Sequence, residues 1–388
     1  MFRKILFWSH LVCGVTAGLV IFMMSLTGVL LAFERQIVSW AEARDYVPEQ
    51  EQSQRLPLEQ LQFMAASYGG MSPSTITLLN NPGAPVVFAE GRRSVSVNPY
   101  TGARMEVGSP ALENFFSINT GLHRWFNLSG ESRDTARMIT GASNLMFLFI
   151  LVSGLYLWFP RLWKWGMFKV RLLFRGTAGN ARARDFNWHH VLGIWSALPL
   201  VCIVATASVF YYPWANNLVY QVYGEETPVR GGPPQTTPGG DDVLGSLPLE
   251  EQAFLGTDAM FASAARYIES EVGSWRQLSM SLPNPGSPFA TFAVDRGNGG
   301  QPQHRHNLVL DRTTGAVTAW QPFSSQSPGR RTRSIIRFLH TGEVLGIWGQ
   351  VVAGLVSFTS LFMVWTGLAL AWRRLASPML RNAPTRVV

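Results

Sequence analysis

Four long apolar segments constrain the fold of this chain more than any other feature of its sequence. They cover residues 5–33, 138–159, 191–212 and 344–371, and none contains Asp, Glu, Lys or Arg. Each is long enough to cross a bilayer core, which takes about 20 apolar residues. Cations precede the first segment, as in a secretory signal, but a signal's apolar region is only about 7–15 residues long and ends at a cleavage site of small residues. We therefore expect four retained membrane spans.

Basic residues flank the spans unevenly and predict the orientation of the chain. The connection between the second and third spans carries a single acid, Asp185, among many cations. These cations are Arg161, Lys164, Lys169, Arg171, Arg175, Arg182 and Arg184. The N-terminal residues 1–4 and the tail after residue 372 are also basic. The positive-inside rule places all three regions in the cytoplasm.

Charge and cysteine content argue against two alternatives. Most of the formal net charge of +8 comes from cations beside the spans, so we do not expect nucleic-acid binding. Cys13 and Cys202 lie inside spans, where they are expected to pack as small side chains. The chain has no CxxCH motif for covalent haem attachment, so any haem would be of the non-covalent b type.

Two large polar segments separate the spans and are expected on the outer side. Each is predicted to begin with an amphipathic helix, at 56–68 and 249–272, and to continue with short strands of alternating apolar residues. The predicted strands cover 75–79, 86–90 and 94–97, then 275–282, 289–294 and 307–310. Each set leads to a Thr-Gly turn, at Thr101-Gly102 and at Thr314-Gly315. The pattern predicts two small α+β domains of one kind, with a flexible connector at 227–240 before the second.

The fold expected is therefore a four-helix transmembrane bundle, built from two parallel repeats, with two small α+β domains outside the membrane. Its predicted parts are a first span (1–35), a first outer domain with a lead-in (36–137), a second span (138–160), a basic cytoplasmic loop (161–188), a third span (189–212), a second outer domain (213–338), a fourth span (339–373) and a cytoplasmic tail (374–388).

A histidine stands at the beginning of each apolar segment. His10 lies in the first, His123 precedes the second, the pair His189–His190 opens the third, and His340 precedes the fourth. An ionisable side chain in a membrane segment usually has a function, and neutral imidazole is a preferred ligand of haem iron. The four positions together predict a transmembrane chain of redox cofactors.

The spans repeat one plan, and the repeat predicts which histidine of the pair is the ligand. Thr27-Gly28 follows His10 at the interval at which Thr206-Ala207 follows His189, whereas counting from His190 misses this match. Both halves of the chain begin in the cytoplasm, which predicts a parallel repeat about an axis along the membrane normal.

Such an axis predicts two histidine pairs at two levels of the membrane. His10 and His189 begin outward-going spans and would lie near the cytoplasmic face. His123 and His340 precede inward-going spans and would lie near the outer face. We therefore predict that each pair ligates one haem.

Five further residues are weaker candidates for binding a haem or a metal. His190 is expected beside the cofactor or at the interface, and it stays an alternative ligand to His189. Arg124 and Arg337 could bind haem propionates, with ordinary interfacial anchoring as the alternative. His304 and His306 form a His-x-His pattern that could bind a metal, but a solvated hairpin is the expected structure.

With these motifs in order, nearly the whole chain resembles the PepSY-associated transmembrane proteins of bacterial inner membranes. The resemblance depends on His10 with Thr27-Gly28, on Leu122-His123-Arg124 followed by Ser153-Gly154 and Trp158-Phe159-Pro160-Arg161, on His189 with Val191-Leu192-Gly193, and on Leu339-His340-Thr341-Gly342 with Thr366-Gly367. It implies that the outer domains are periplasmic PepSY modules. The chain departs from the family at His190, where Arg is common, and at Ala207, where Gly is common.

The resemblance also implies a function. Characterised members are siderophore-iron reductases that use membrane b-type haems to reduce ferric iron in the periplasm. We therefore expect two b-type haems held by His10, His189, His123 and His340, and a ferric siderophore as the substrate. No catalytic acid–base residue is assigned. Without a nicotinamide or flavin motif, the electron donor is expected to be a quinol or a cytoplasmic reductase.

Three alternatives remain open. The chain could deliver electrons to another periplasmic acceptor, or it could be a non-redox PepSY protein that binds or regulates a partner while its histidines only pack. It could also be a transporter, although the lack of charges inside the spans disfavours an ionic or proton-coupled substrate.

Overall fold

The computed structural model divides the chain into two compact units. It describes every residue except 48–53, 92, 177–178, 229–252, 285 and 382–388. The helical unit comprises Met1–Arg35, Ala111–Val219 and Ile335–Val388, and the sheet unit comprises Gln36–Pro110 and Tyr220–Ser334. Most of the predicted connector at 227–240, and the start of the helix predicted at 249–272, therefore lie outside the described residues.

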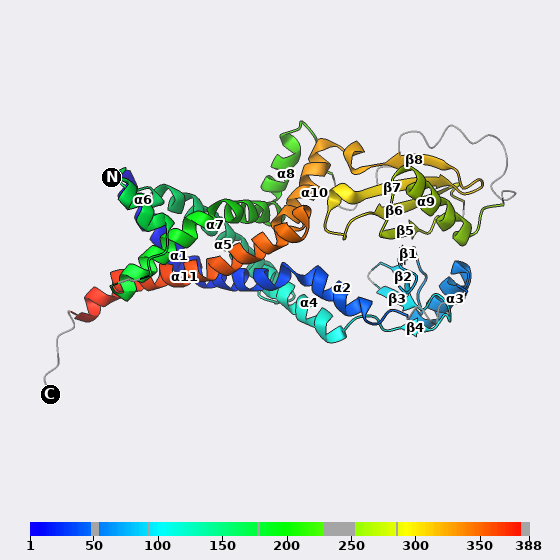
Figure 1. Cartoon of the computed structure of the whole chain (residues 1–388), viewed down its shortest axis with the longest axis horizontal. Coiled ribbons are helices and arrows are strands. Elements are labelled where there is room, and N and C mark those ends of the chain that lie inside the picture. Colours follow the sequence, from blue (N-terminus) through cyan, green and yellow to red (C-terminus); the bar gives the residue numbers. More distant parts are fainter. Residues whose placement is uncertain (48–53, 92, 177–178, 229–252, 285, 382–388) are drawn as a thin grey trace. The chain divides into compact units, whose positions relative to one another are not determined.

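Among the described residues, four helices of the helical unit are long and apolar enough to cross a membrane, which agrees with the predicted number of spans. They are α1 (Phe2–Leu31), α5 (Glu131–Trp158), α7 (Ala181–Tyr211) and α11 (Gly346–Arg381) (Figure 1). Helix α5 begins about two turns, and helix α7 nearly three turns, before the apolar segment predicted from the sequence. The reason is that polar residues extend each helix beyond its apolar part: at α7, the Asn180 side chain caps the first turn by accepting a hydrogen bond from the Ala183 N–H.

The four helices form a closed ring of neighbours. Helix α1 packs against α5 and α11, and α7 packs against the same two helices, so α1 and α7 are diagonal partners. Buried amides connect adjacent helices of this ring. Asn144 Nδ2 of α5 donates to the Val204 carbonyl of α7 at 3.1 Å, and Gln350 Nε2 of α11 donates to the Ala32 carbonyl at the end of α1 at 2.7 Å. Amide groups inside a membrane bundle need such partners.

Shorter helices lead into and out of the spans. They are α2 (Glu34–Ala43) after α1, α4 (Pro110–Trp125) before α5, α6 (Trp165–Leu172) between α5 and α7, α8 (Pro213–Gln221) after α7, and α10 (Pro328–His340) with the 3₁₀ turn η5 (Glu343–Leu345) before α11. The turn after α10 needs glycine. Gly342 has φ +78°, and a Cβ there would lie 2.3 Å from the Gly349 carbonyl oxygen. This close approach of two backbones packs the turn directly onto α11.

Within its described residues, the sheet unit holds one antiparallel sheet of eight strands in the order β4-β3-β2-β1-β5-β6-β7-β8. The strands are β1 (Thr75–Leu79), β2 (Val86–Glu90), β3 (Arg93–Val97), β4 (Arg104–Met105), β5 (Gln277–Ser281), β6 (Phe289–Asp295), β7 (Arg305–Asp311) and β8 (Val317–Gln321). Strands β1 and β5 meet at the centre with Thr77 opposite Ser279, and their hydroxyl oxygens are 2.9 Å apart. The two α+β segments predicted from the sequence thus share one continuous sheet, because the first strand of each exposes a pairing edge to the other.

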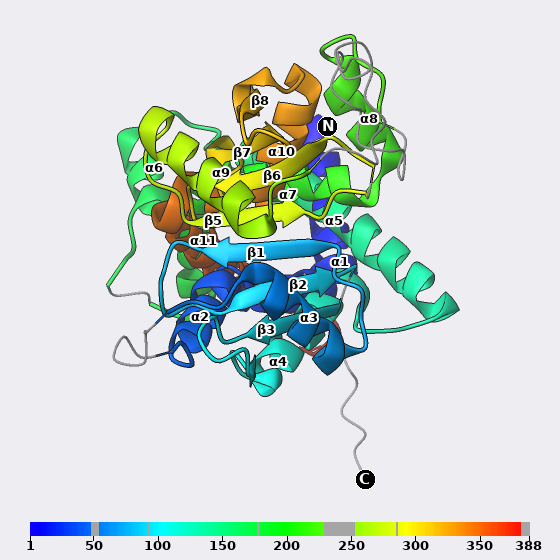
Figure 2. The same ribbon diagram turned by 90° about the vertical axis from the view of Figure 1, so that its right-hand side faces the viewer.

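Helices α3 (Leu58–Gly69) and α9 (Thr257–Glu271) cover one face of this sheet (Figure 2). The core beneath them is formed by every second residue of the strands, as a half-buried sheet requires. Phe88 of β2 and Phe292 of β6 are fully buried there. This arrangement confirms the α-helix and strand segments predicted in both polar regions, except that β4 and β8 were not predicted.

The two halves of the sheet unit repeat the same hydrogen bonds. Asn98 Oδ1 accepts from the backbone of Tyr100 and Thr101, and Asp311 Oδ1 accepts from the backbone of Thr313 and Thr314. Both turns end in a glycine at φ +71°, Gly102 and Gly315, each packed against the helix of its own half. The Thr-Gly turns predicted from the sequence are therefore present in both halves.

The helices of the two halves also cap each other. The Leu58 N–H at the start of α3 donates to Asp258 Oδ2 at 2.8 Å, and the Thr257 N–H at the start of α9 donates to Glu59 Oε1. Each carboxylate thus satisfies the open first turn of the opposite helix. Burial and the adjacent Glu59 raise the pKa of Asp258.

Candidate functional site

Each of the four predicted histidine ligands contacts a hydroxyl residue on another helix. At one end of the bundle, His10 of α1 places Nδ1 2.9 Å from Ser153 Oγ of α5. His189 of α7 places Nδ1 3.1 Å from Thr366 Oγ1 of α11. The neighbouring pairs α1–α5 and α7–α11 are therefore joined in the same way.

The same contact occurs twice at the other end. His123, at the end of α4, places Nδ1 2.9 Å from Thr27 Oγ1 of α1. His340, at the end of α10, places Nδ1 3.4 Å from Thr206 Oγ1 of α7. The Ser/Thr residues that marked the sequence repeat are thus the partners of the histidines, a role that the sequence analysis did not assign to them.

A backbone carbonyl determines which ring nitrogen carries the proton. His340 Nδ1 lies 2.8 Å from the Ile203 carbonyl oxygen, and His189 Nδ1 lies 3.1 Å from that of Met363. His10 and His123 also interact with backbone carbonyls, those of Ile150 and Met24. Because a carbonyl can only accept, Nδ1 must be the protonated nitrogen, and Nε2 keeps a free lone pair. A metal-binding imidazole needs this arrangement, with its second nitrogen donating to a carbonyl.

Glycines make room for three of these rings. A Cβ on Gly154 would lie 3.2 Å from His10 Cε1, and one on Gly367 would lie 3.3 Å from His189 Cε1. A Cβ on Gly28 would lie 3.5 Å from His123 Cε1. The Gly of each Ser/Thr-Gly pair therefore lets the imidazole approach the helix next to its hydroxyl partner.

The structure brings the histidines together in the pairs predicted from the repeat. The ring centres of His123 and His340 are 6.3 Å apart, with 62° between the ring planes. An iron bound by one imidazole on either side, with metal–nitrogen bonds of about 2 Å, would hold the ring centres roughly 6 Å apart. His10 and His189 lie close enough to interact electrostatically. The residues present therefore fit a haem with two axial imidazoles.

Burial keeps His123 and His340 neutral. Burial lowers the pKa of His123 to about 4, and the adjacent His340 adds to this shift. Burial also lowers the pKa of His340. Both rings are therefore neutral imidazoles near pH 7, the form that binds iron.

Arginines gather near His123 and His340. Arg124 lies within electrostatic range of Arg133, Arg137 and Arg337. Arg124 and Arg133 also lie over the ring of Trp125, at 4.7 and 4.1 Å from its centre. In the part of the chain that the structure describes, no carboxylate lies within ion-pair distance of these four arginines. Arg124 and Arg337 were predicted as propionate partners; Arg133 and Arg137 were missed, since they lie in the first turns of α5 before its apolar part.

The other histidines lack this environment. His190 Nδ1 contacts the carbonyl of Phe186 in its own helix, and its ring packs 4.0 Å from the Phe186 ring. Of the pair, His189 therefore shares the contacts of the other three histidines. His306 of β7 packs against Trp320 instead of lying in a solvated hairpin. Among the described residues, no group of three or more His, Cys, Asp or Glu side chains could hold a bare metal ion.

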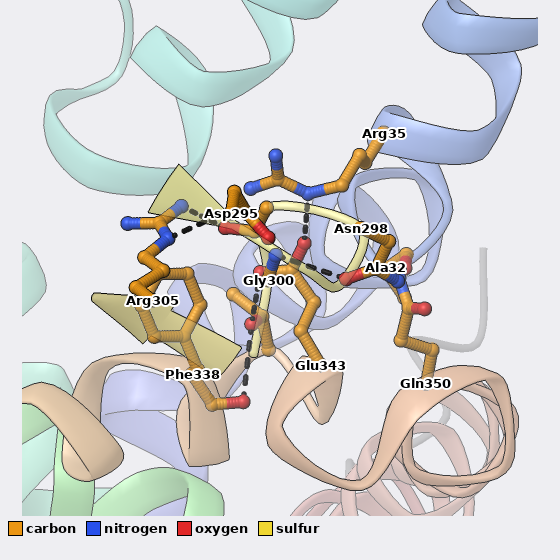
Figure 3. A network of polar contacts seen from close by, with 11 residues as sticks. Ala32, Arg35, Asp295, Asn298, Gly300, Arg305, Phe338, Glu343 and Gln350 are labelled. Atoms are coloured by element: carbon orange, nitrogen blue, oxygen red, sulfur yellow. Dashed lines mark hydrogen bonds and ion pairs between the residues drawn. The ribbon is translucent and has the colours of Figure 1, made fainter. Parts of the chain in front are cut away.

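A polar network fixes the turn after His340 (Figure 3). Arg35 Nε, just beyond α1, lies 2.6 Å from Glu343 Oε1, and Thr341 Oγ1 donates to Glu343 Oε2 at 2.8 Å. Glu343 is only 7% exposed, so its charge depends on Arg35 for compensation.

These features define an integral membrane protein with a four-helix bundle and an antiparallel α+β unit. The family model described as the PepSY-associated TM region matches residues 7–374. The chain therefore belongs to the PepSY-associated transmembrane family, as the sequence motifs predicted. A comparison with curated proteins finds no match.

Proposed function

We propose that this protein is a di-haem b-type membrane reductase that passes electrons across the membrane to ferric siderophore iron and releases Fe(II). The observation that carries this proposal is the common environment of the four histidines. In each, Nδ1 contacts a Ser or Thr hydroxyl on another helix, and in His189 and His340 it also faces a backbone carbonyl, so that Nε2 would be free to bind iron.

The chain's own residues would hold and orient the cofactors. His10 with His189, and His123 with His340, supply two imidazoles for each of two haems. Haem supplies the one-electron redox chemistry that the protein side chains lack. The arginines near His123 supply guanidinium groups for the carboxylates of the macrocycle, and Arg124 and Arg337 remain the residues we assign to this role.

The proposed location is the bacterial inner membrane, with both termini in the cytoplasm and the sheet unit in the periplasm. The cations between α5 and α7 favour this orientation. We also infer that the chain consists of two parallel repeats, because the histidine contacts and the turns of the sheet unit occur once in each half.

The proposed substrate is Fe(III) in a siderophore. Hard oxygen donors hold Fe(III) much more strongly than Fe(II), so a single electron added to the iron weakens the complex. No general acid or base is needed for this step. Delivery of electrons to another periplasmic acceptor would use the same histidines and is the second candidate.

Spectra of the purified full-length chain test the cofactor proposal. We expect a b-type spectrum with low-spin iron. His123→Ala and His340→Ala should each remove the same component, His10→Ala and His189→Ala the other, and His190→Ala neither. A colourless protein, or loss of both components in all four variants, would contradict the proposed sites.

Stopped-flow oxidation tests the substrate separately. The reduced protein should be reoxidised by a ferric siderophore, with Fe(II) captured by a chelator. Normal spectra without reoxidation by several ferric siderophores would favour a different periplasmic acceptor.

A further inference from the structure

The connection between α5 and α7 must lie at the membrane surface, because it joins two consecutive spans. Its apolar side chains are nevertheless exposed: Trp163 is 77% and Trp165 73% exposed, and Leu162, Leu173 and Phe174 are also exposed. Exposed indoles and leucines beside a span are typical of a segment that lies in the lipid headgroup region.

This connection is firmly attached to the bundle. Asn187 of α7 is only 2% exposed, and its Nδ2 donates to the carbonyls of Val170 and Leu173 at 2.7 and 3.0 Å. Its Oδ1 accepts from the Arg175 N–H at 3.0 Å. The backbone around Arg175 therefore has a fixed position against α7.

A cavity of about 420 Å³ lies between the connection and α7. Its lining combines cations with apolar surface: Arg175 and Arg182 together with Val170, Phe186, Ala183 and the amides of Asn180 and Asn187. A second cavity of about 360 Å³ shares Arg175 and Asn180 and adds Arg184 and Trp188. Guanidinium groups beside an apolar wall match a phosphate group attached to a hydrocarbon chain.

Two of the arginines that line these cavities, Arg175 and Arg182, have no carboxylate partner within the described part of the chain. Asp185 is the single acid of the connection, and it is buried in ion pairs with Arg184 at 2.9 Å and Arg373 at 2.5 Å. Neither Arg175 nor Arg182 lies within ion-pair distance of a carboxylate among the described residues. Both guanidinium groups are therefore available to an external anion.

We infer that this site binds the phosphate headgroup of an anionic membrane phospholipid, with Arg175 and Arg182 holding the phosphate and Val170 and Phe186 contacting the glycerol and first acyl carbons. The exposed tryptophans set the depth of the site in the membrane, and the apolar wall favours a lipid over a free phosphate ion. None of the residues assigned to this site is one of the four proposed haem ligands.

Lipid binding to the delipidated full-length chain in neutral detergent tests this inference. Native mass spectrometry would follow titrations with phosphatidylglycerol, phosphatidylcholine and inorganic phosphate. The test variant is Arg175→Gln/Arg182→Gln. The control is Arg161→Gln/Lys164→Gln, which removes the same charge from the same connection but outside both cavities.

We expect one tightly retained phosphatidylglycerol in the wild type, weakened roughly 10- to 30-fold in the test variant and less than about 3-fold in the control. Arg175→Lys/Arg182→Lys should retain part of the affinity. Equal losses in test and control would mean general surface attraction and overturn the site. Equal binding of phosphatidylcholine, or competition by inorganic phosphate at similar concentrations, would also overturn it.

Discussion

Arg35 and Glu343 form a 2.6 Å ion pair that joins the end of α1 to the turn between His340 and α11. The carboxylate is buried, whereas the side chain of Arg35 is 37% exposed. A buried charge that loses its partner costs more than the pair contributes, since the remaining ion is still desolvated. The pair therefore makes the geometry near His340 sensitive to a residue more than 300 positions away in the sequence.

The first prediction concerns the unequal burial of Arg35 and Glu343. Arg35→Gln should lower the free energy of unfolding by about 1–3 kcal/mol, because it leaves the Glu343 carboxylate buried without a cation. Glu343→Gln should cost less, since its amide can still accept from Thr341. Thermal unfolding of the full-length chain would measure both. In the double variant the losses should not add; strictly additive losses would mean that the two side chains do not interact.

The second prediction distinguishes Thr27 from Thr206, two residues that occupy equivalent positions in the sequence repeat. Thr27 Oγ1 lies 2.9 Å from His123 Nδ1, whereas Thr206 Oγ1 lies 3.4 Å from His340 Nδ1, which already has the Ile203 carbonyl at 2.8 Å. Loss of a partner of a ligand imidazole typically costs about 10- to 100-fold in affinity. Thr27→Val should therefore weaken haem retention by about 10-fold or more, and Thr206→Val much less.

Haem retention in both variants can be followed by transfer of haem to apomyoglobin. The shape- and volume-matched valine keeps the packing, so the comparison reports the hydroxyl. Equal retention by the two variants would show that the distance difference has no consequence for the ligands.

The third prediction uses glycines as steric tests. Gly154→Val and Gly367→Val should displace His10 and His189, because even a Cβ would lie 3.2 and 3.3 Å from their Cε1 atoms. Gly14→Val on α1 is the matched control, since a Cβ there meets nothing within 4 Å. Absorption spectra should show the loss of one haem component in the first two variants and none in the third. An intact spectrum in Gly154→Val would contradict the close approach of His10.

The sequence predicted the spans and the histidine pairs because both depend on local signals. A run of apolar residues predicts a span without knowledge of its neighbours, and two copies of one plan predict which positions are equivalent. The sequence also contained Thr27 and Thr206 as markers of the repeat, and Ser153 and Thr366 in the family motifs. It did not predict that they contact histidines, because that contact depends on which helices are adjacent.

The joining of β1 and β5 was missed for a related reason. Both segments alternate apolar and polar residues, as any strand does with one face buried. Alternation predicts which face of a strand is buried, but it does not identify which other strand will pair with its free edge. The pairing of Thr77 with Ser279 depends on the fold of both halves together.

The fourth prediction concerns pH and the reciprocal caps of α3 and α9. A carboxyl whose pKa is raised by folding stabilises the fold at pH values below its ordinary range, and this contribution is lost as the pH rises through the raised value. Asp258 is such a group, with burial and Glu59 as the causes. As the pH rises above the ordinary range of an aspartate, about pH 4, the start of α3 should therefore become less protected from hydrogen exchange.

Asp258→Asn should remove most of this dependence, since its carbonyl still accepts from the Leu58 N–H while its amide can donate to Glu59 at any pH.

The pKa of Glu59 is lowered, because hydrogen bonds from the backbone and from Asp258 outweigh the effect of burial. Ionised Glu59 therefore stabilises the fold at pH values above the ordinary pKa of a glutamate. This contribution is lost only as the pH falls through its lowered pKa. The gain in the free energy of unfolding from Asp258→Asn near pH 7 should stay below about 1 kcal/mol, because Asp258 is only partly buried and solvent screens its charge. Hydrogen exchange of peptides covering the first turns of α3 and α9 would measure these effects. A wild-type profile as flat as that of the variant would mean that folding does not raise the pKa of Asp258.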